Sequence, residues 1–136
     1  MQDFQEDEKK NHNRIMLVED DTTITHVLKR QLERWGYEVF DTVDFEHVME
    51  AFAGWKPDLV LMDIDMPEMD GIETAKRIME MTDRTVPILF VTALCDRQTV
   101  TLCRNLDAAG YIVRPYKPVF VKTEIKRILM GRSEIE

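Results

Sequence analysis

Five short apolar runs recur along the chain, and each is followed by a segment in which apolar residues return at helical spacing. The runs are IMLV (15–18), YEVF (37–40), DLVLM (58–62), VPILFV (86–91) and YIV (111–113). Runs of this length predict β-strands. Alternation of strands with helices predicts a parallel sheet with right-handed crossovers and helices on both faces. Strands covered on both faces are continuously apolar, as these runs are.

Helical spacing predicts the elements between the strands. Thr22 or Thr23 can cap a first helix that Gly36 closes. Its apolar positions keep to one face, namely Ile24, Val27, Leu28, Leu32 and Trp35. Further helices are predicted over 45–54, 71–81, 97–109 and 119–130. We expect residues 1–13 to form a disordered or loosely packed tail, 14–131 the domain, and 132–136 a C-terminal tail.

Composition adds limits on location and partners. The 136 residues are 44% apolar and 32% charged, which is typical of one globular domain. No apolar run approaches the ~20 residues that span a bilayer, and the polar N-terminus lacks a secretory signal, so we expect a cytoplasmic protein without membrane contact. Cys95 and Cys103 are predicted to be reduced thiols. The net charge of -8 argues against direct contact with nucleic acid.

Polar residues that could bind a ligand or take part in a reaction follow the predicted strands. In an open α/β sheet, ligands bind outside the carboxyl ends of the strands, where the strand order reverses. If the order is 2-1-3-4-5, this point lies between the first and third strands, and both of its walls are acidic. The residues at the strand ends are Glu19, Asp20 and Asp21; Asp63, Ile64 and Asp65; Thr92; and Arg114 with Pro115.

Carboxylates crowded at one edge of a sheet repel one another unless a cation lies among them. Oxygen ligands without Cys or His favour Mg²⁺ or Mn²⁺. A simpler interpretation is that Asp20 or Asp21 caps the next helix and that Asp63 is a turn residue. The coincidence of two acidic clusters, a hydroxyl and a cation at the ends of four strands favours the metal site.

Four strings occur in order along the chain: MLVEDD, LVLMDIDMPEMDG, ILFVTA and AAGYIVRPYKP. With them, the sequence from Arg14 to Met130 resembles the receiver domain of two-component response regulators. The resemblance implies a flavodoxin-like, doubly wound, five-stranded α/β fold with strand order 2-1-3-4-5. It also implies a signalling switch or relay component rather than an enzyme, with self-catalysed phosphorylation and dephosphorylation. A sensor histidine kinase or phosphotransfer protein would donate the phosphoryl group, and an unidentified downstream protein would read the result.

The resemblance also assigns roles to individual residues. Asp63 corresponds to the phosphoacceptor, which would form an aspartyl phosphate. Asp20 corresponds to a direct Mg²⁺ ligand, and Glu19 to one that acts through water. The backbone carbonyl of Asp65 completes the protein's share of the metal site.

The switch residues implied by the resemblance are Thr92, whose hydroxyl closes onto the phosphoryl group, and Tyr111, whose orientation follows it. Arg114 stands where the family has Lys, although Lys117 could serve instead if the loop is rearranged. Arg supplies charge and a planar fork of donors but is not interchangeable with Lys. The resemblance implies a cis bond between Arg114 and Pro115.

Two other functions stay open. A pseudo-receiver would keep the fold but no longer switch, and Arg114 is the best argument for it. A haloacid-dehalogenase-type phosphatase also uses a strand-end Asp-x-Asp, but there the motif follows the first strand and MPEMDG has no place.

Leu94 cannot orient an attacking water, which predicts a long-lived phosphoryl group. Four methionines could form either a partner surface or part of the core: Met66, Met69, Met79 and Met81.

Overall fold

The computed structural model describes residues 13–67 and 69–135. The strands of its main sheet are β1 (Arg14–Val18), β2 (Glu38–Thr42), β3 (Leu59–Met62), β6 (Ile88–Thr92) and β7 (Gly110–Val113). They lie in the order β2-β1-β3-β6-β7, and all neighbours in this sheet run parallel. When the five strands of this sheet are numbered by their place in the chain, their order is 2-1-3-4-5. The predicted α/β fold is therefore confirmed.

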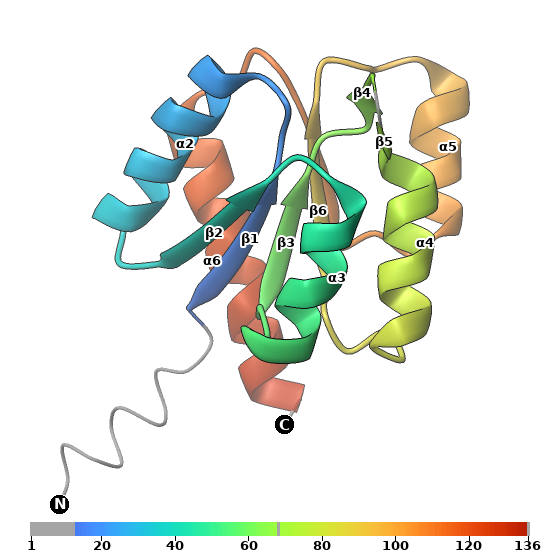
Figure 1. Cartoon of the computed structure of the whole chain (residues 1–136). Helices are drawn as coiled ribbons and strands as arrows, with labels where there is room; N and C mark the ends of the chain where they lie inside the picture. The colour runs from blue at the N-terminus through green and yellow to red at the C-terminus, as the bar shows by residue number, and fades with distance from the viewer. Residues whose placement is uncertain (1–12, 68, 136) are drawn as a thin grey trace, which may run out of the picture.

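Helices cover both faces of the sheet (Figure 1). Their bounds are α2 (Thr22–Arg34), α3 (Phe45–Gly54), α4 (Gly71–Met81), α5 (Arg97–Asn105) and α6 (Pro118–Ile135). Buried residues of α2 and α6 pack against one face, and those of α3, α4 and α5 pack against the other. The predicted spans 45–54 and 71–81 match α3 and α4.

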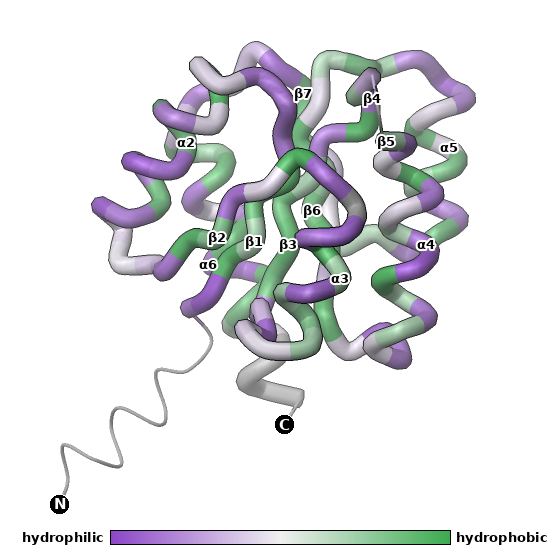
Figure 2. Tube along the Cα trace, viewed as in Figure 1, coloured by the Kyte–Doolittle hydropathy of each residue, from purple (hydrophilic) through white to green (hydrophobic). Residues whose placement is uncertain are grey.

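Alternate residues of the central strands supply the two cores, because successive side chains of a strand point to opposite faces. In β3, Val60 and Met62 face α3, α4 and α5, whereas Leu59 and Leu61 face α2 and α6. All four are fully buried. Figure 2 shows the resulting band of hydrophobic residues along the central strands, with hydrophilic residues along much of α2. Burial on both faces explains why the strand sequences are continuously apolar.

Asp21, and not Thr22 or Thr23, caps α2. The Asp21 carboxylate accepts hydrogen bonds from the backbone N–H groups of Thr23 and Ile24 at 2.9 and 3.1 Å. Both threonines lie inside the helix, which begins at Thr22, so the predicted cap was one or two residues late. At the other end Gly36 has a positive φ of 99°, which fits its predicted place just after the helix.

Two helices differ in length from their predictions. The helix predicted over 97–109 ends at Asn105, because Asp107 adopts a left-handed φ of 63° and the Ala108 N–H donates back to the Cys103 carbonyl. No glycine marks this stop. The helix predicted over 119–130 continues to Ile135, so the tail expected from residue 132 begins inside α6. Gly131 lies within it, since a helical glycine costs only about 1 kcal/mol relative to alanine.

An antiparallel hairpin, absent from the predictions, follows β3. It consists of β4 (Asp65–Met66) and β5 (Met69–Asp70), and its two methionines pair with each other. The Asp70 carboxylate then caps α4 by accepting hydrogen bonds from the Ile72 and Glu73 N–H groups at 2.9 and 3.2 Å. The hairpin thus turns the chain from the end of β3 directly into the first turn of α4.

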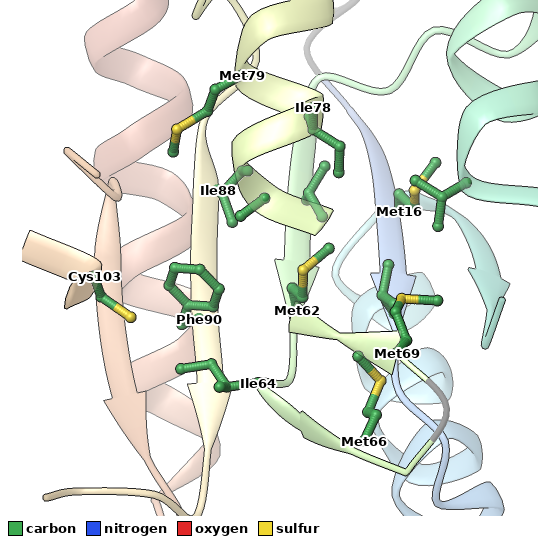
Figure 3. Close-up of a cluster of buried hydrophobic side chains, with 14 of the residues drawn as sticks. Met16, Met62, Ile64, Met66, Met69, Ile78, Met79, Ile88, Phe90 and Cys103 are labelled. Atoms are coloured by element: carbon green, nitrogen blue, oxygen red, sulfur yellow. The ribbon is translucent and has the colours of Figure 1, made fainter. Parts of the chain in front are cut away.

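Methionine side chains meet in the core between the sheet and helices α3 to α5 (Figure 3). Met66 and Met69 of the hairpin and Met79 of α4 are each at most 7% exposed, whereas Met81 is 51% exposed. Flexible thioether side chains fill irregular gaps well. The core interpretation is therefore correct for three of the four methionines, and Met81 lies at the surface.

Candidate functional site

The carboxyl ends of β1 and β3 bring three carboxylates together. Val18 and Met62 are paired in the sheet, so the residues after them, Glu19 and Asp63, leave the same edge side by side. Glu19, Asp20 and Asp63 each offer an oxygen within 4.8 Å of the others. Glu19 and Asp63 are buried, at 4% and 6% exposure, and Asp20 is exposed. The pairing of β1 with β3 thus explains why Asp63 lies beside Glu19 and Asp20, although at least 43 positions separate it from them in the sequence.

Backbone N–H groups fix the Asp63 carboxylate. Its Oδ1 accepts hydrogen bonds from Ile64 at 2.7 Å and, more weakly, from Asp65 at 3.4 Å. The Asp63 N–H itself donates to the Val18 carbonyl at 3.0 Å. Since Oδ1 is held by the backbone, Oδ2 is the oxygen directed at the neighbouring side chains. Asp65 follows in β4 and is exposed.

Gly71 lies directly against the backbone of the Asp63 segment. Its N–H donates to the Ile64 carbonyl at 3.2 Å. A Cβ at this position would lie 2.7 Å from the Ile64 Cα and closer still to the Asp63 carbonyl oxygen. Only glycine fits without displacing backbone. The sequence predicted only the start of a helix here, and no spacing rule could have revealed this contact.

Glu19 is held from two sides. Its Oε2 accepts the Asp21 N–H at 3.1 Å, and its Oε1 accepts Nη1 of Arg114 at 2.9 Å. Burial raises the pKa of the Glu19 carboxyl above its ordinary value. Hydrogen bonds from Asp21 and Arg114 act in the opposite direction, while the nearby charge of Asp63 adds to the rise.

Arg114 reaches both buried carboxylates from the loop after β7. Its Nη2 donates to Asp63 Oδ2 at 3.0 Å, while Nη1 holds Glu19. Burial lowers the pKa of Arg114, but hydrogen bonds and charges from Glu19 and Asp63 outweigh it, so the net shift is upward. The Arg114–Pro115 bond is cis, as expected. Lys117 is exposed and forms no ion pair within 13–67 and 69–135, so the structure brings Arg114, not Lys117, to the cluster.

Thr92 and Tyr111 meet at the backbone of Leu94. The fully buried Thr92 accepts the Leu94 N–H on its hydroxyl oxygen at 3.3 Å. The Tyr111 hydroxyl donates to the Leu94 carbonyl, and its ring packs on Phe90 with 6.4 Å between centroids. Burial raises the pKa of Tyr111 to about 12, so this hydroxyl stays a donor at neutral pH. Both predicted switch residues therefore hold one loop.

The arrangement can do chemistry that suits a phosphoryl group and a hard cation. The donor set is carboxylate oxygen throughout, which fits Mg²⁺ or Mn²⁺ rather than a softer metal. The guanidinium adds a planar pair of donors suited to phosphoryl oxygens. In the described part of the chain, no helix combines the length and apolar character needed to cross a membrane.

Two curated bacterial proteins are similar to this chain over most of its length. The chain is 34% identical over 116 residues to the sensory transduction protein BceR of Halalkalibacterium halodurans, a match that covers 85% of this chain and 49% of BceR. It is 35% identical over 124 residues to the alkaline phosphatase synthesis transcriptional regulatory protein PhoP of Bacillus subtilis, covering 91% and 51%. The chain thus spans about half the length of the curated relatives it matches.

Solved structures agree with this similarity. A response regulator receiver domain protein (CheY-like) from Methanospirillum hungatei has a TM-score of 0.85 at 27% identity, over 91% of this chain and 98% of that one. The chemotaxis protein CheY4 of Vibrio cholerae, at 23% identity and a TM-score of 0.79 over 85% and 98%, supports the fold alone. The sequence model of the response regulator receiver domain matches residues 15–126, which include every residue of the acidic cluster and Arg114. The chain therefore belongs to the response regulator receiver domain family.

Proposed function

We propose that this chain is a signalling switch or relay component that accepts a phosphoryl group on Asp63. Receiver domains are phosphoacceptor signalling domains, and response regulators are typically phosphorylated by sensor histidine kinases. The observation that carries the proposal is the placement of Asp63 Oδ2. This oxygen is buried in a cluster with Glu19 and Asp20, and a guanidinium lies 3.0 Å from it.

The transfer step follows from the contacts of Asp63. Oδ2 attacks the phosphorus of a phosphohistidine, or of a small phosphodonor, and forms a P–O bond while the P–N or P–O bond to the donor breaks. The electron pair of the broken bond leaves with the donor, and Asp63 gives up no proton because it reacts as a carboxylate. The Ile64 N–H holds Oδ1 throughout, which aims Oδ2. Arg114 can donate to an oxygen of the incoming group.

Receiver domains bind Mg²⁺ at an acidic pocket, and the cluster here fits such an ion. In our proposal Asp20 and Asp63 hold Mg²⁺ or Mn²⁺ directly, Glu19 acts through water, and the Asp65 carbonyl completes the protein's share. A bound divalent ion supplies charge neutralisation for the transferring group.

The proposed readout begins at Leu94. The Thr92 hydroxyl leaves the Leu94 N–H for a phosphoryl oxygen, and the Tyr111 side chain follows because it holds the same residue. The surface formed by α5, β7 and α6 then changes, and a downstream protein distinguishes the two states. Leu94 carries no group that could orient an attacking water, so we propose a long-lived phosphoryl group. Loss of the group within seconds would contradict this part.

The proposal concerns protein partners only. The PhoP relative is named as a transcriptional regulatory protein, but this chain matches 51% of it, and we propose that the receiver itself contacts neither nucleic acid nor membrane. A reducing, cytoplasmic location stays part of the proposal, and the free thiols of Cys95 and Cys103 fit it.

A pseudo-receiver is the second candidate, because Arg114 already holds Asp63 Oδ2. Acetyl phosphate with Mg²⁺, followed by intact-mass analysis, separates the two functions. We expect one phosphoryl adduct on the unmodified chain and none on Asp63→Asn. An unmodified chain that gains no adduct refutes the proposal and supports the pseudo-receiver. Turnover of many phosphoesters without a stable adduct would instead indicate a phosphatase.

A further inference from the structure

Helices α2 and α6 lie side by side on one face of the sheet and leave a groove between them. The part of this groove beside the loop after β7 is a largely apolar pocket of about 330 Å³. Its lining includes Ile24, Val27 and Leu28 of α2 and Tyr116 of the loop. A pocket of this volume falls at the lower end of those that bind ligands, so it has room for one large side chain.

Four cations continue the groove toward the C-terminal ends of the two helices. In each helix the two cations follow an exposed valine, Val27 or Val119, by three and seven positions, so they share its side of the helix. Nζ of Lys122 lies 5.7 Å from the centroid of the Trp35 ring, which joins the two rows. The cations are Arg30 and Arg34 of α2 and Lys122 and Lys126 of α6.

These four side chains lack an acidic partner. Within residues 13–67 and 69–135, none of them forms an ion pair. Lys29, on the opposite side of α2, is by contrast paired with Asp41 at 2.8 Å. The chain has 26 acidic residues and 18 basic ones, so four unpaired cations in one groove are unusual in it. Their field favours an acidic segment at this place.

The N-terminal segment of the chain starts from the matching end of the molecule. Figure 1 shows β1 beginning at the end of the sheet where α2 and α6 stop. The backbone N–H of Glu38, four residues after Arg34, donates to the Asn13 carbonyl at 2.8 Å. Residues 1–12 lie outside the described part of the chain, but the residue that follows them is thus fixed close to the cationic end of the groove.

The sequence of this segment, MQDFQEDEKKNH, combines an acidic run at 6–8 with one aromatic residue, Phe4. The run lies five to seven residues before Asn13, and so many extended residues span at most about 17–25 Å. Nine residues separate Phe4 from Asn13, which allows about 30 Å. The helix from Arg34 back to Ile24 rises only about 15 Å. The acidic run can therefore reach the four cations while Phe4 reaches the apolar pocket.

We propose that residues 4–8 dock in the α2–α6 groove of the same chain, with Phe4 in the apolar pocket and the acidic run against the four cations. This inference goes beyond the proposed function and stands without it, since it involves neither Asp63 nor a metal ion. A docked segment covers the exposed side of α2 and the adjoining loop after β7. It is thus an intramolecular cover that a large partner must displace to bind this face.

Nuclear Overhauser effects in the full, unmodified chain test the contact directly. We expect cross-peaks between the ring protons of Phe4 and the methyl groups of Ile24 and Val27. A mixture of isotope-labelled and unlabelled chains shows whether the two partners belong to one molecule. Absence of these cross-peaks at low salt would refute the docking. Cross-peaks that arise only between different chains would place the segment of a second copy in the groove and would equally refute it.

Trypsin cleavage after Lys9 and Lys10, followed by mass analysis, measures how firmly the segment is held. Reversing two cations, in Arg30→Glu with Arg34→Glu, removes attraction and adds repulsion, so we expect cleavage roughly tenfold faster than in the unmodified chain. Phe4→Ala should raise the rate by a similar factor, because it empties the pocket.

The matched control reverses two exposed cations on the other face of the sheet, in Lys76→Glu with Arg104→Glu. It makes the same change in net charge, and cleavage after Lys9 and Lys10 should stay within about twofold of the unmodified chain because solvent screens charges this far away. Equal rates in the unmodified chain and in the Arg30→Glu, Arg34→Glu chain would refute the docking. So would an equal acceleration by the control pair, which would show a general effect of net charge.

Discussion

Replacing Gly71 by alanine tests whether the first turn of α4 positions the segment that holds Asp63, the proposed phosphoacceptor. The added Cβ would lie 2.7 Å from the Ile64 Cα, where ordinary contact begins at 3.4 Å, and it would meet the Asp63 carbonyl as well. Both neighbours are backbone, so no side chain can rotate away and the segment itself must move. Forcing an extra methyl group into packed structure costs about 1–3 kcal/mol, against at most about 1 kcal/mol gained from the higher helix propensity of alanine. We expect a net loss of about 1–2 kcal/mol of unfolding free energy.

Urea unfolding, without metal, gives the stability, and acetyl phosphate labelling gives the rate at which Asp63 reacts. A displacement of the Asp63 carboxylate by a fraction of a bond length is enough to slow transfer of the phosphoryl group. We therefore expect the labelling rate to fall about tenfold or more. Gly54→Ala is the control, because a Cβ at Gly54 meets nothing within 4 Å; it should leave stability unchanged or raise it by up to about 1 kcal/mol. A Gly71→Ala chain with unaltered stability and labelling rate would refute the role of this close approach.

Three further substitutions test separate parts of the structure. Asp21→Ala removes the cap of α2 and should lower the unfolding free energy by about 1 kcal/mol in urea, whereas Asp20→Ala, at a residue that caps nothing, should not lower it; equal losses would contradict the assignment of the cap. The side-chain hydrogen bond with Asp44 raises the pKa of His47, and the His47 backbone N–H together with its ring lowers the pKa of Asp44. The pair therefore stabilises the fold while Asp44 is ionised and His47 is protonated. This contribution to stability is complete below the ordinary histidine pKa of about 6.5 and fades as the pH rises through the raised pKa of His47. Asp44→Asn should lower the His47 pKa measured by nuclear magnetic resonance, and an unchanged pKa would exclude the pairing. Met62→Ala empties a fully buried position in β3 and should cost about 2–5 kcal/mol, so a loss below about 1 kcal/mol would contradict close packing there.

The sheet could be predicted because its signal is local. Each central strand is buried on both faces, so its residues are apolar without interruption, and the first polar residue after the run marks its end. Glu19 after β1 and Asp63 after β3 are such residues, and parallel pairing then requires them to leave the same edge. Both the fold and the meeting of the acidic residues therefore follow from short stretches of sequence.

Helix ends and turns were predicted less well, because several residue types can satisfy the same backbone groups. Asp21 and the two threonines after it are all good caps, and only the path of the chain decides that Asp21 takes the position. Asp107 adopts a left-handed conformation that sequence patterns assign first to glycine, so the end of α5 had no visible signal. The contact of Gly71 with Asp63 depends on how a helix meets a strand end, which no local pattern encodes.

Arg114 marks the boundary between what the sequence could and could not predict. Its offset from Tyr111 identified it as the cation at the end of β7, in preference to Lys117, and the structure places its guanidinium on Asp63. The bond to Glu19 joins residues 95 positions apart, and the bond to Asp63 joins residues 51 apart, so both depend on three loops meeting at one edge. A lysine in the same place would keep the positive charge and offer three donors from one nitrogen, but it would lack the rigid planar fork of the guanidinium. A substitution that leaves the charge pattern of the sequence unchanged therefore changes how the donors are arranged at Glu19 and Asp63, and this difference arises only from geometry.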